Sequence, residues 1–152
     1  MLKHIFFTLG ILTLLSCKTY NEDQKTGFDN AIQSHIDSLQ LKGFKKLSTG
    51  LVYKILESGD VNQKIKYFDN VNIYYTGSLL NGEIFDYRKE NDPINFDVKD
   101  LIVGWQDALS LIGEGGKIEI YIPPYLSYGD NKTDKIPQNS ILHFVLGVTK
   151  VV

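Results

Sequence analysis

Hydrophobic and polar residues alternate along several segments of the chain, and this period of two predicts β-strands. The alternation runs through residues 71–76, 118–122 and 142–148, and a further strand, interrupted by Thr49-Gly50, is expected over residues 46–58. Asn81-Gly82 separates two apolar runs and favours the positive backbone angles of a tight turn. This dipeptide predicts a hairpin between Asn70 and Tyr87.

Two other segments have the spacing of a helix. Apolar residues recur at helical intervals from Phe28 to Leu41, and Gly43 follows where a glycine commonly ends a helix. Residues 101–111 form the one convincing helix among the strands. Strands grouped around a single helix indicate the α+β class, with an antiparallel sheet bent over that helix and an N-terminal helical appendage. The apolar face of the appendage can pack on the domain or on a second copy of the chain, and the sequence leaves both open.

The chain begins with MLKHIFFTLGILTLLSC, a basic start followed by an apolar run too short to span a bilayer as a mature helix. We interpret residues 1–16 as an export signal. Leu-Leu-Ser-Cys at its end resembles the lipobox of bacterial lipoproteins, which implies cleavage before Cys17 and lipid modification of that cysteine. The alternative is an ordinary secretory signal that leaves a free thiol. Because the chain has no second cysteine as a disulfide partner, the lipid anchor is favoured.

The rest of the chain divides into three parts. Residues 17–27 are polar without periodicity and are expected to form a flexible tether, residues 28–46 contain the N-terminal helix, and residues 47–152 form the main domain. The composition, 43% hydrophobic and 22% charged over 152 residues, fits one globular domain with a sizeable core. A formal charge of -2 with scattered lysines argues against nucleic-acid binding.

Residues of the usual catalytic apparatus are sparse. His4 lies in the signal, His35 on the N-terminal helix, and His143 on the side of the last strand that we expect to face solvent. This distribution gives no basis for a metal site or a histidine-based triad, and we expect no cofactor. Residues 113–116 lack the lysine and hydroxyl of a phosphate-binding loop, so they predict a tight turn.

Aromatic residues instead lie at the edges of the expected elements, in three stretches that resemble FKBP-type peptidyl-prolyl isomerases in order and spacing. The stretches are YYTGSLLNGEIFD (residues 74–86), LIVGWQDALSLIGEGGKIEIYIPPYLSYG (101–129) and KIPQNSILHFVLGVTKV (135–151). The resemblance covers residues 47–152 and implies five or six antiparallel strands wrapped around a short helix. It also implies a proline pocket between helix and sheet, with Trp105 as its floor and Gly104 permitting close backbone approach.

The resemblance further implies a role for individual residues. Tyr75, Phe85, Trp105 and Phe144 line the implied pocket, with Leu101 and Ile102 as a further wall and Ile94 at the position of a wall phenylalanine. The backbone N–H of Ile102 and the hydroxyl of Tyr128 are implied to donate hydrogen bonds to substrate carbonyls. Asp86 is implied at the polar rim, where it contacts ligand or bonds neighbouring groups of its own chain.

The sequence also departs from the family pattern near the implied pocket. Ile94 replaces an aromatic side chain, and the polar segment GDNKTDK occupies residues 129–135, where many members have glycines and apolar residues. Lys135 stands at a place that is often isoleucine. These departures put the binding of macrolide inhibitors, and the range of substrates, in doubt.

The implied activity is cis-trans isomerisation of X-Pro bonds, without a covalent step, acid, base or metal. A dry aromatic pocket disfavours the planar, dipolar amide more than the twisted one. With the export signal, this predicts an isomerase anchored to a bacterial membrane through lipidated Cys17, facing outside the cytoplasm and acting on proline-containing segments of exported proteins.

Two other functions stay open. The same pocket can serve a low-activity proline-binding or chaperone module in an envelope complex, or the chain can be a structural lipoprotein in which core side chains fully cover Trp105. The N-terminal helix can in addition form a homodimer contact.

Overall fold

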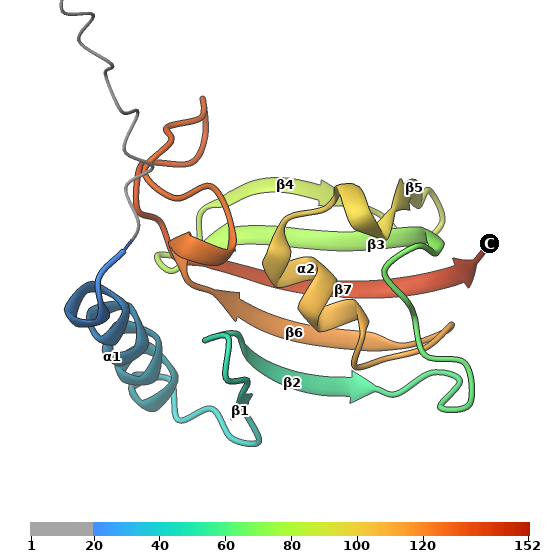
Figure 1. Ribbon diagram of the computed structural model, residues 1–152, viewed down its shortest axis with the longest axis horizontal. Helices are drawn as coiled ribbons and strands as arrows, with labels where there is room; N and C mark the ends of the chain where they lie inside the picture. Colours follow the sequence, from blue (N-terminus) through green and yellow to red (C-terminus); the bar gives the residue numbers. More distant parts are fainter. Residues whose placement is uncertain (1–19) are drawn as a thin grey trace, which may run out of the picture.

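The computed structural model describes residues 20–152 of the chain (Figure 1). The expected export signal, with His4, and the expected lipidation site Cys17 lie outside the described residues.

Seven strands form one sheet, and all neighbouring strands in it are antiparallel. They are β1 (Lys45–Lys46), β2 (Val52–Glu57), β3 (Asn70–Leu79), β4 (Ile84–Arg88), β5 (Ile94–Asp97), β6 (Lys117–Ile122) and β7 (Leu142–Val151). Their order is β1-β2-β6-β7-β3-β4, and β5 pairs with β3 beside β4. The α+β class is confirmed. The sheet has more strands than expected because β1 and β5 are too short to show an alternating pattern.

The predicted hairpin is confirmed between β3 and β4. Gly82 adopts a φ of +86°, and its N–H donates to the Leu79 carbonyl oxygen at 2.9 Å. A positive φ is readily reached only without a Cβ, which explains why glycine follows asparagine here.

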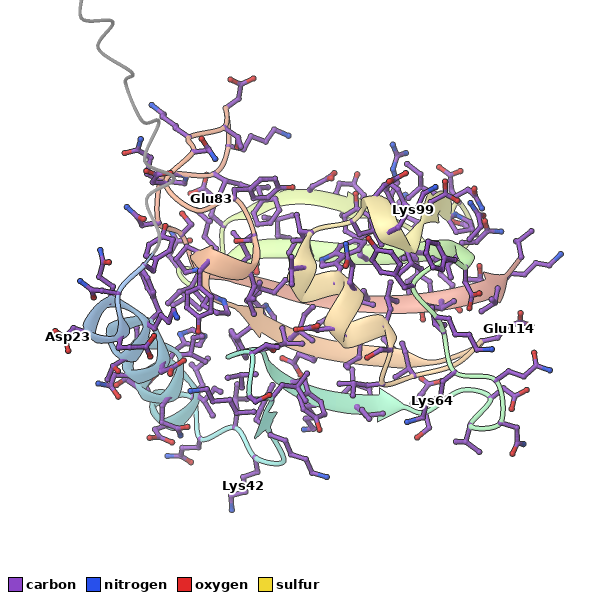
Figure 2. The ribbon with its side chains drawn as sticks, in the orientation of Figure 1. Asp23, Lys42, Lys64, Glu83, Lys99 and Glu114 are labelled. Carbon is purple, nitrogen blue, oxygen red and sulfur yellow. The ribbon has the colours of Figure 1, made fainter. Side chains whose placement is uncertain are left out.

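The short helix α2 (Val103–Leu109) lies across the inner face of the sheet, in front of β3, β7 and β6 (Figure 1). Ala108 and Leu109 of α2 are fully buried in one cluster with Ile120 and Leu146 of the sheet. A Cβ on Gly104 would come within 2.5 Å of Ile122 Cγ2, so the close approach expected at this glycine is made to β6. Figure 2 shows the labelled charged side chains on the outline of the molecule, away from this core.

The N-terminal helix α1 (Glu22–Ser38) begins six residues before the expected Phe28 and takes in part of the segment expected as a tether. The reason is a capping box: Asn21 Oδ1 accepts from the Gln24 N–H at 2.8 Å, and Gln24 Oε1 accepts from the Asn21 N–H at 3.0 Å. This cap satisfies two backbone donors and outweighs the polar composition. No helix among residues 20–152 is long and apolar enough to cross a bilayer.

Helix α1 packs on the outer face of the sheet. Ile32 and Ile36 form a second buried cluster with Val52 and Tyr121. Of the two packing modes that the sequence left open, the structure shows contact with the domain. Dimerisation through α1 stays a prediction.

The expected exposure of His143 is wrong because α1 covers this part of the outer face. The His143 ring stacks on Tyr121 with centroids 4.6 Å apart, and its Nε2 lies 3.0 Å from Glu119 Oε1. Ser78 Oγ lies 3.2 Å from His143 Nδ1. An appendage that adds a second layer cannot be read from the alternation within a strand.

A substitution in α1 tests whether the helix belongs to the cooperative unit. A Cβ on Gly27 would meet nothing within 4 Å. Alanine is the better helix former, so we expect Gly27→Ala to raise the free energy of unfolding by up to about 1 kcal/mol. Urea denaturation followed by circular dichroism measures the change. Gly82→Ala is the control, since its site is equally open but its φ of +86° makes the substitution destabilising. An unchanged unfolding free energy for Gly27→Ala would mean that α1 unfolds separately.

His35, in the last turn of α1, makes stability depend on pH. Its ring lies 5.5 Å from that of Tyr121, and burial, followed by the nearby His143, lowers the pKa of His35. The folded chain therefore holds this proton less readily than the unfolded chain, and stability is lost as the pH falls below about 6.5. We expect the urea midpoint of the parent chain to fall more between about pH 7.5 and 5.5 than that of His35→Gln. Equal decreases in the two proteins would contradict the assignment to His35.

Candidate active site

A cavity of about 390 Å³ opens between α2 and the sheet. Apart from Ile94, every residue predicted for the site lines it: Tyr75, Phe85, Asp86, Leu101, Ile102, Trp105, Tyr128 and Phe144. Phe96 and Asp100 complete the lining. The fold thus brings together side chains from β3, β4, β5, α2 and β7, from the segment just before α2 and from the loop that follows β6.

The sheet register aims the aromatic side chains inward. Tyr75 on β3 lies opposite Leu146, and Gly77 lies opposite Phe144, so Tyr75 and Phe144 share the face that α2 covers. The β3–β4 register shifts between Gly77 and Ser78, which leaves Phe85 in a bulge of β4. Bulges commonly redirect a side chain beside a functional site, and this one points Phe85 at Phe144.

The ring of Trp105 contacts several of the other aromatic rings that line the cavity. Its ring centroid lies 5.0 Å from that of Tyr75 and 5.1 Å from that of Phe144, at interplanar angles of 75° and 89°. Phe85 and Phe144 meet edge to face at 5.5 Å. These edge-to-face contacts fix the rings relative to one another, so the cavity wall is rigid and apolar.

The indole of Trp105 is 5% exposed, and its Nε1 has no hydrogen-bond partner within residues 20–152. A buried donor without a protein partner is uncommon in a folded protein, and here it lies on a side chain that lines the cavity. The ring borders the cavity and is not sealed on all sides by core side chains, which argues against a purely structural role.

Asp86 is held by its own chain. Its Oδ2 accepts from the Tyr75 hydroxyl at 2.7 Å, and its Oδ1 accepts from the Tyr87 N–H at 2.8 Å. Burial, then the bond to Asp86, raises the pKa of Tyr75, so its hydroxyl remains a donor across the physiological range. Of the two roles left open for Asp86, the structure contains the bonds within the chain, and ligand contact stays a prediction.

Two donors lie at the cavity edge. Ile102 precedes the first residue of α2, and within residues 20–152 its N–H donates to no protein acceptor, although its carbonyl oxygen accepts from the Trp105 N–H at 2.9 Å. Tyr128 also lines the cavity and is 39% exposed, which places it at the cavity mouth, and no hydrogen bond of its hydroxyl is found within residues 20–152. An apolar ring flanked by two free donors suits a ligand with one apolar ring and adjoining carbonyl groups.

The structure corrects the expectation for Ile94. This residue lies on β5 opposite Ile73 and does not line the cavity, whereas Phe96, two residues later, does. The centroids of Phe96 and Trp105 are 6.3 Å apart. Residues two apart on a strand share a face, so Ile94 and Phe96 in the stretch INFD were both candidates for the cavity wall. The sequence interpretation chose only Ile94. Asp100 had no signal in the sequence, because it reaches the site through the turn before α2.

The polar loop borders the cavity, as its place in the sequence implied. A neighbouring hollow of about 440 Å³ shares Phe85, Asp86 and Tyr128 with the aromatic cavity and is completed by residues 133–136. Lys135 Nζ donates to the Phe85 carbonyl oxygen at 3.2 Å, which ties this loop to β4. The charged side chains of this loop therefore border the aromatic cavity without lining it, and the charged residues in the lining itself are Asp86 and Asp100.

Within the part of the chain that the structure describes, no cluster of three or more His, Cys, Asp or Glu side chains could hold a metal ion. The residues that line the aromatic cavity offer desolvation and hydrogen bonding, and none of them is a nucleophile paired to a base.

Comparison with known proteins identifies similar chains over most of this fold. Residues 61–148 match the family model for FKBP-type peptidyl-prolyl cis-trans isomerase. The chain is 40% identical over 127 residues to the FKBP-type peptidyl-prolyl cis-trans isomerase FkpA of Buchnera aphidicola subsp. Schizaphis graminum, a match that covers 81% of this chain. The match covers 50% of that relative, so the chain spans about half its length.

Solved structures agree with the sequence matches. The crystal structure of FkpA from Escherichia coli superposes with a TM-score of 0.73 and 35% identity, over 85% of this chain and 61% of that one. A peptidyl-prolyl cis-trans isomerase from Pseudomonas syringae superposes with a TM-score of 0.68 and 26% identity, over 84% of this chain and 95% of that one.

Proposed function

The chain belongs to the FKBP-type peptidyl-prolyl cis-trans isomerase family, and from this membership and the aromatic cavity we propose that it accelerates rotation about X-Pro bonds. The observation that carries the proposal is the set of Tyr75, Phe85, Trp105 and Phe144 around one cavity. This cavity has the apolar lining that a proline ring requires.

The proposed mechanism needs no covalent intermediate. Rotation about the X-Pro bond faces a resonance barrier of about 18 to 20 kcal/mol, and the amide becomes less dipolar as it twists. A dry, rigid aromatic wall disfavours the planar, dipolar form more than the twisted form. Lowering the barrier by about 5 kcal/mol would accelerate rotation by nearly four powers of ten.

Two hydrogen-bond donors at the cavity edge are proposed to hold the substrate. The Ile102 N–H and the Tyr128 hydroxyl hold the substrate carbonyls on the two sides of the rotating bond. Asp86 fixes the Tyr75 hydroxyl, which keeps the Tyr75 ring in place against Trp105. Fixed rings require no reorganisation when the proline twists.

The proposed setting is the bacterial cell envelope, outside the cytoplasm. Its support is the sequence of the first 17 residues, which implies export and lipidation of Cys17. The substrates are then proline-containing segments of exported proteins. Six of the ten residues between Cys17 and Phe28 lie in α1.

The test is a protease-coupled assay of the full chain, purified in detergent, on a peptide that carries an X-Pro bond. We expect catalysed isomerisation that saturates with peptide. Absence of turnover in a chain whose circular dichroism shows it folded would overturn the proposal.

A low-activity proline-binding or chaperone module is the second candidate. It is favoured by the polar loop of residues 129–135, which sits beside the cavity and lacks the apolar residues found in many family members. The discriminating result is quenching of Trp105 fluorescence by a proline peptide without turnover of that peptide.

A further inference from the structure

The residue just before the cap of α1 contacts the loop that carries Tyr128. The Tyr20 hydroxyl donates to Asn139 Oδ1 at 2.6 Å, across 119 positions of sequence. Burial, then the charge of Asp130, raises the pKa of Tyr20, so the hydroxyl keeps its proton at neutral pH. This bond joins the N-terminal segment to Asn139, which lies four residues after the polar loop of residues 129–135.

A backbone hydrogen bond connects Asn139 to the residue that follows Tyr128. Its backbone N–H donates to the Gly129 carbonyl oxygen at 2.9 Å, and Gly129 directly follows Tyr128. Gly129 in turn donates its N–H to the Pro124 carbonyl oxygen at 2.9 Å, which closes the turn around Tyr128. Two hydrogen bonds and one peptide unit thus separate the Tyr20 hydroxyl from the residue at the cavity mouth.

Two residues of this segment have a left-handed backbone conformation. Asn139 has a φ of +58°, a region that asparagine enters more readily than most residues with a Cβ, and Gly129 has a φ of +63°. Such a conformation persists where surrounding contacts determine it. Among the described residues, Asn139 accepts one side-chain hydrogen bond from Tyr20 and donates one backbone hydrogen bond to Gly129, and both hold it in this conformation.

Aromatic packing places Tyr20 for this contact. Its ring lies 5.5 Å from that of Phe28 in α1 and 6.1 Å from that of Tyr125, three residues before Tyr128. The rings of Phe28 and Tyr125 are themselves 6.4 Å apart. Tyr20 therefore bridges α1 and both ends of the segment that carries Tyr128. Figure 1 shows the loop that follows β6 next to the start of α1.

We propose that Tyr20 is a positioning residue for the isomerase site, which through Asn139 holds the turn that presents the Tyr128 hydroxyl to substrate. The proposal rests on the proposed function, and it gives the N-terminal appendage a role in catalysis. The appendage and the catalytic domain then form one functional unit.

The test is a double-mutant cycle on the full chain. We expect Tyr20→Phe to lower kcat/KM for an X-Pro peptide by a factor of about three to ten, the range that one neutral hydrogen bond represents. In a Tyr128→Phe background the same substitution is expected to change kcat/KM by less than about twofold, because the hydroxyl that it positions is gone. Equal losses in the two backgrounds, or no loss in either, would overturn the proposal.

Two further variants test the acceptor of this hydrogen bond and control for the loss of a tyrosine hydroxyl elsewhere. Asn139→Gly removes the acceptor while permitting the positive φ, so it should match Tyr20→Phe and add nothing to it. Tyr53→Phe is the matched control, since Tyr53 lies on β2, which is separated from β3 by β6 and β7, and no hydrogen bond of its hydroxyl is found within residues 20–152. It is expected to leave kcat/KM unchanged.

Hydrogen exchange separates this inference from the proposed function. The segment from Tyr128 to Ser140 should exchange its amides faster in Tyr20→Phe and Asn139→Gly than in the parent chain, whether or not the chain is an isomerase. An inactive parent with faster exchange in the variants would overturn only the proposed function. An active parent with unchanged exchange and unchanged kcat/KM in the variants would overturn only the role of Tyr20.

Discussion

Trp105→Leu is expected to lower kcat/KM for an X-Pro peptide by at least about tenfold, which corresponds to about 1.4 kcal/mol of lost transition-state stabilisation. The indole contacts both Tyr75 and Phe144, so its loss removes the floor of the cavity and the edge-to-face contacts that fix two walls. Leucine keeps the site apolar but leaves space for water. The measurement is the protease-coupled assay, made at a temperature where circular dichroism shows both proteins to be folded.

A control must separate this effect from simple destabilisation. Leu51 is fully buried in the same core, just before β2, and does not line the cavity. Leu51→Ala should cost about 2 to 5 kcal/mol of stability and leave kcat/KM of the folded fraction unchanged. If Trp105→Leu retained the parent activity, or if Leu51→Ala lost as much, the cavity would not be the catalytic site.

The sequence predicted the fold class because the deciding features are local. Alternation marked β3, β6 and β7, and Asn81-Gly82 marked the turn between β3 and β4. Strand β5 was missed because four residues between turns, INFD, show too short an alternation to stand out. The start of α1 was missed because the capping box at Asn21 lies within a polar segment that resembles a linker.

The site was predicted in a different way, from the resemblance of three stretches to a known family. A single aromatic residue did not indicate a binding site, since most aromatic residues in a domain belong to the core. What the resemblance could not supply was anything specific to this chain. The partial burial of His143 and the bond from Tyr20 to Asn139 both depend on how the N-terminal segment packs on the domain, and the interpretation had treated that segment as separate.

Gly77 shows how the sheet itself shapes the cavity. It lies within β3, where glycine weakens a strand and usually marks a close approach. A Cβ at this position would come within 2.4 Å of Phe144 Cε1 and 2.8 Å of two ring atoms of Phe85. Both rings lie directly over the glycine, so the cavity wall depends on the absence of a side chain beneath it.

We therefore expect Gly77→Ala to lower the free energy of unfolding by about 2 to 4 kcal/mol, because two packed rings must move and the core has little free volume. It should also lower kcat/KM by at least about tenfold in the folded fraction, since the rings that move are those proposed to hold proline. Urea denaturation and the peptide assay measure the two effects on the same protein.

Gly147→Ala is the matched control on the opposite face of the sheet. A Cβ there would come within 2.3 Å of the Tyr74 ring, an overlap as severe as that at Gly77. Tyr74 points away from the cavity, because its neighbour Tyr75 points into it and successive side chains alternate. Gly147→Ala should thus destabilise the fold and spare kcat/KM. Equal loss of activity in the two variants would mean that activity follows global stability, and that the position of the Phe85 and Phe144 rings does not control isomerisation.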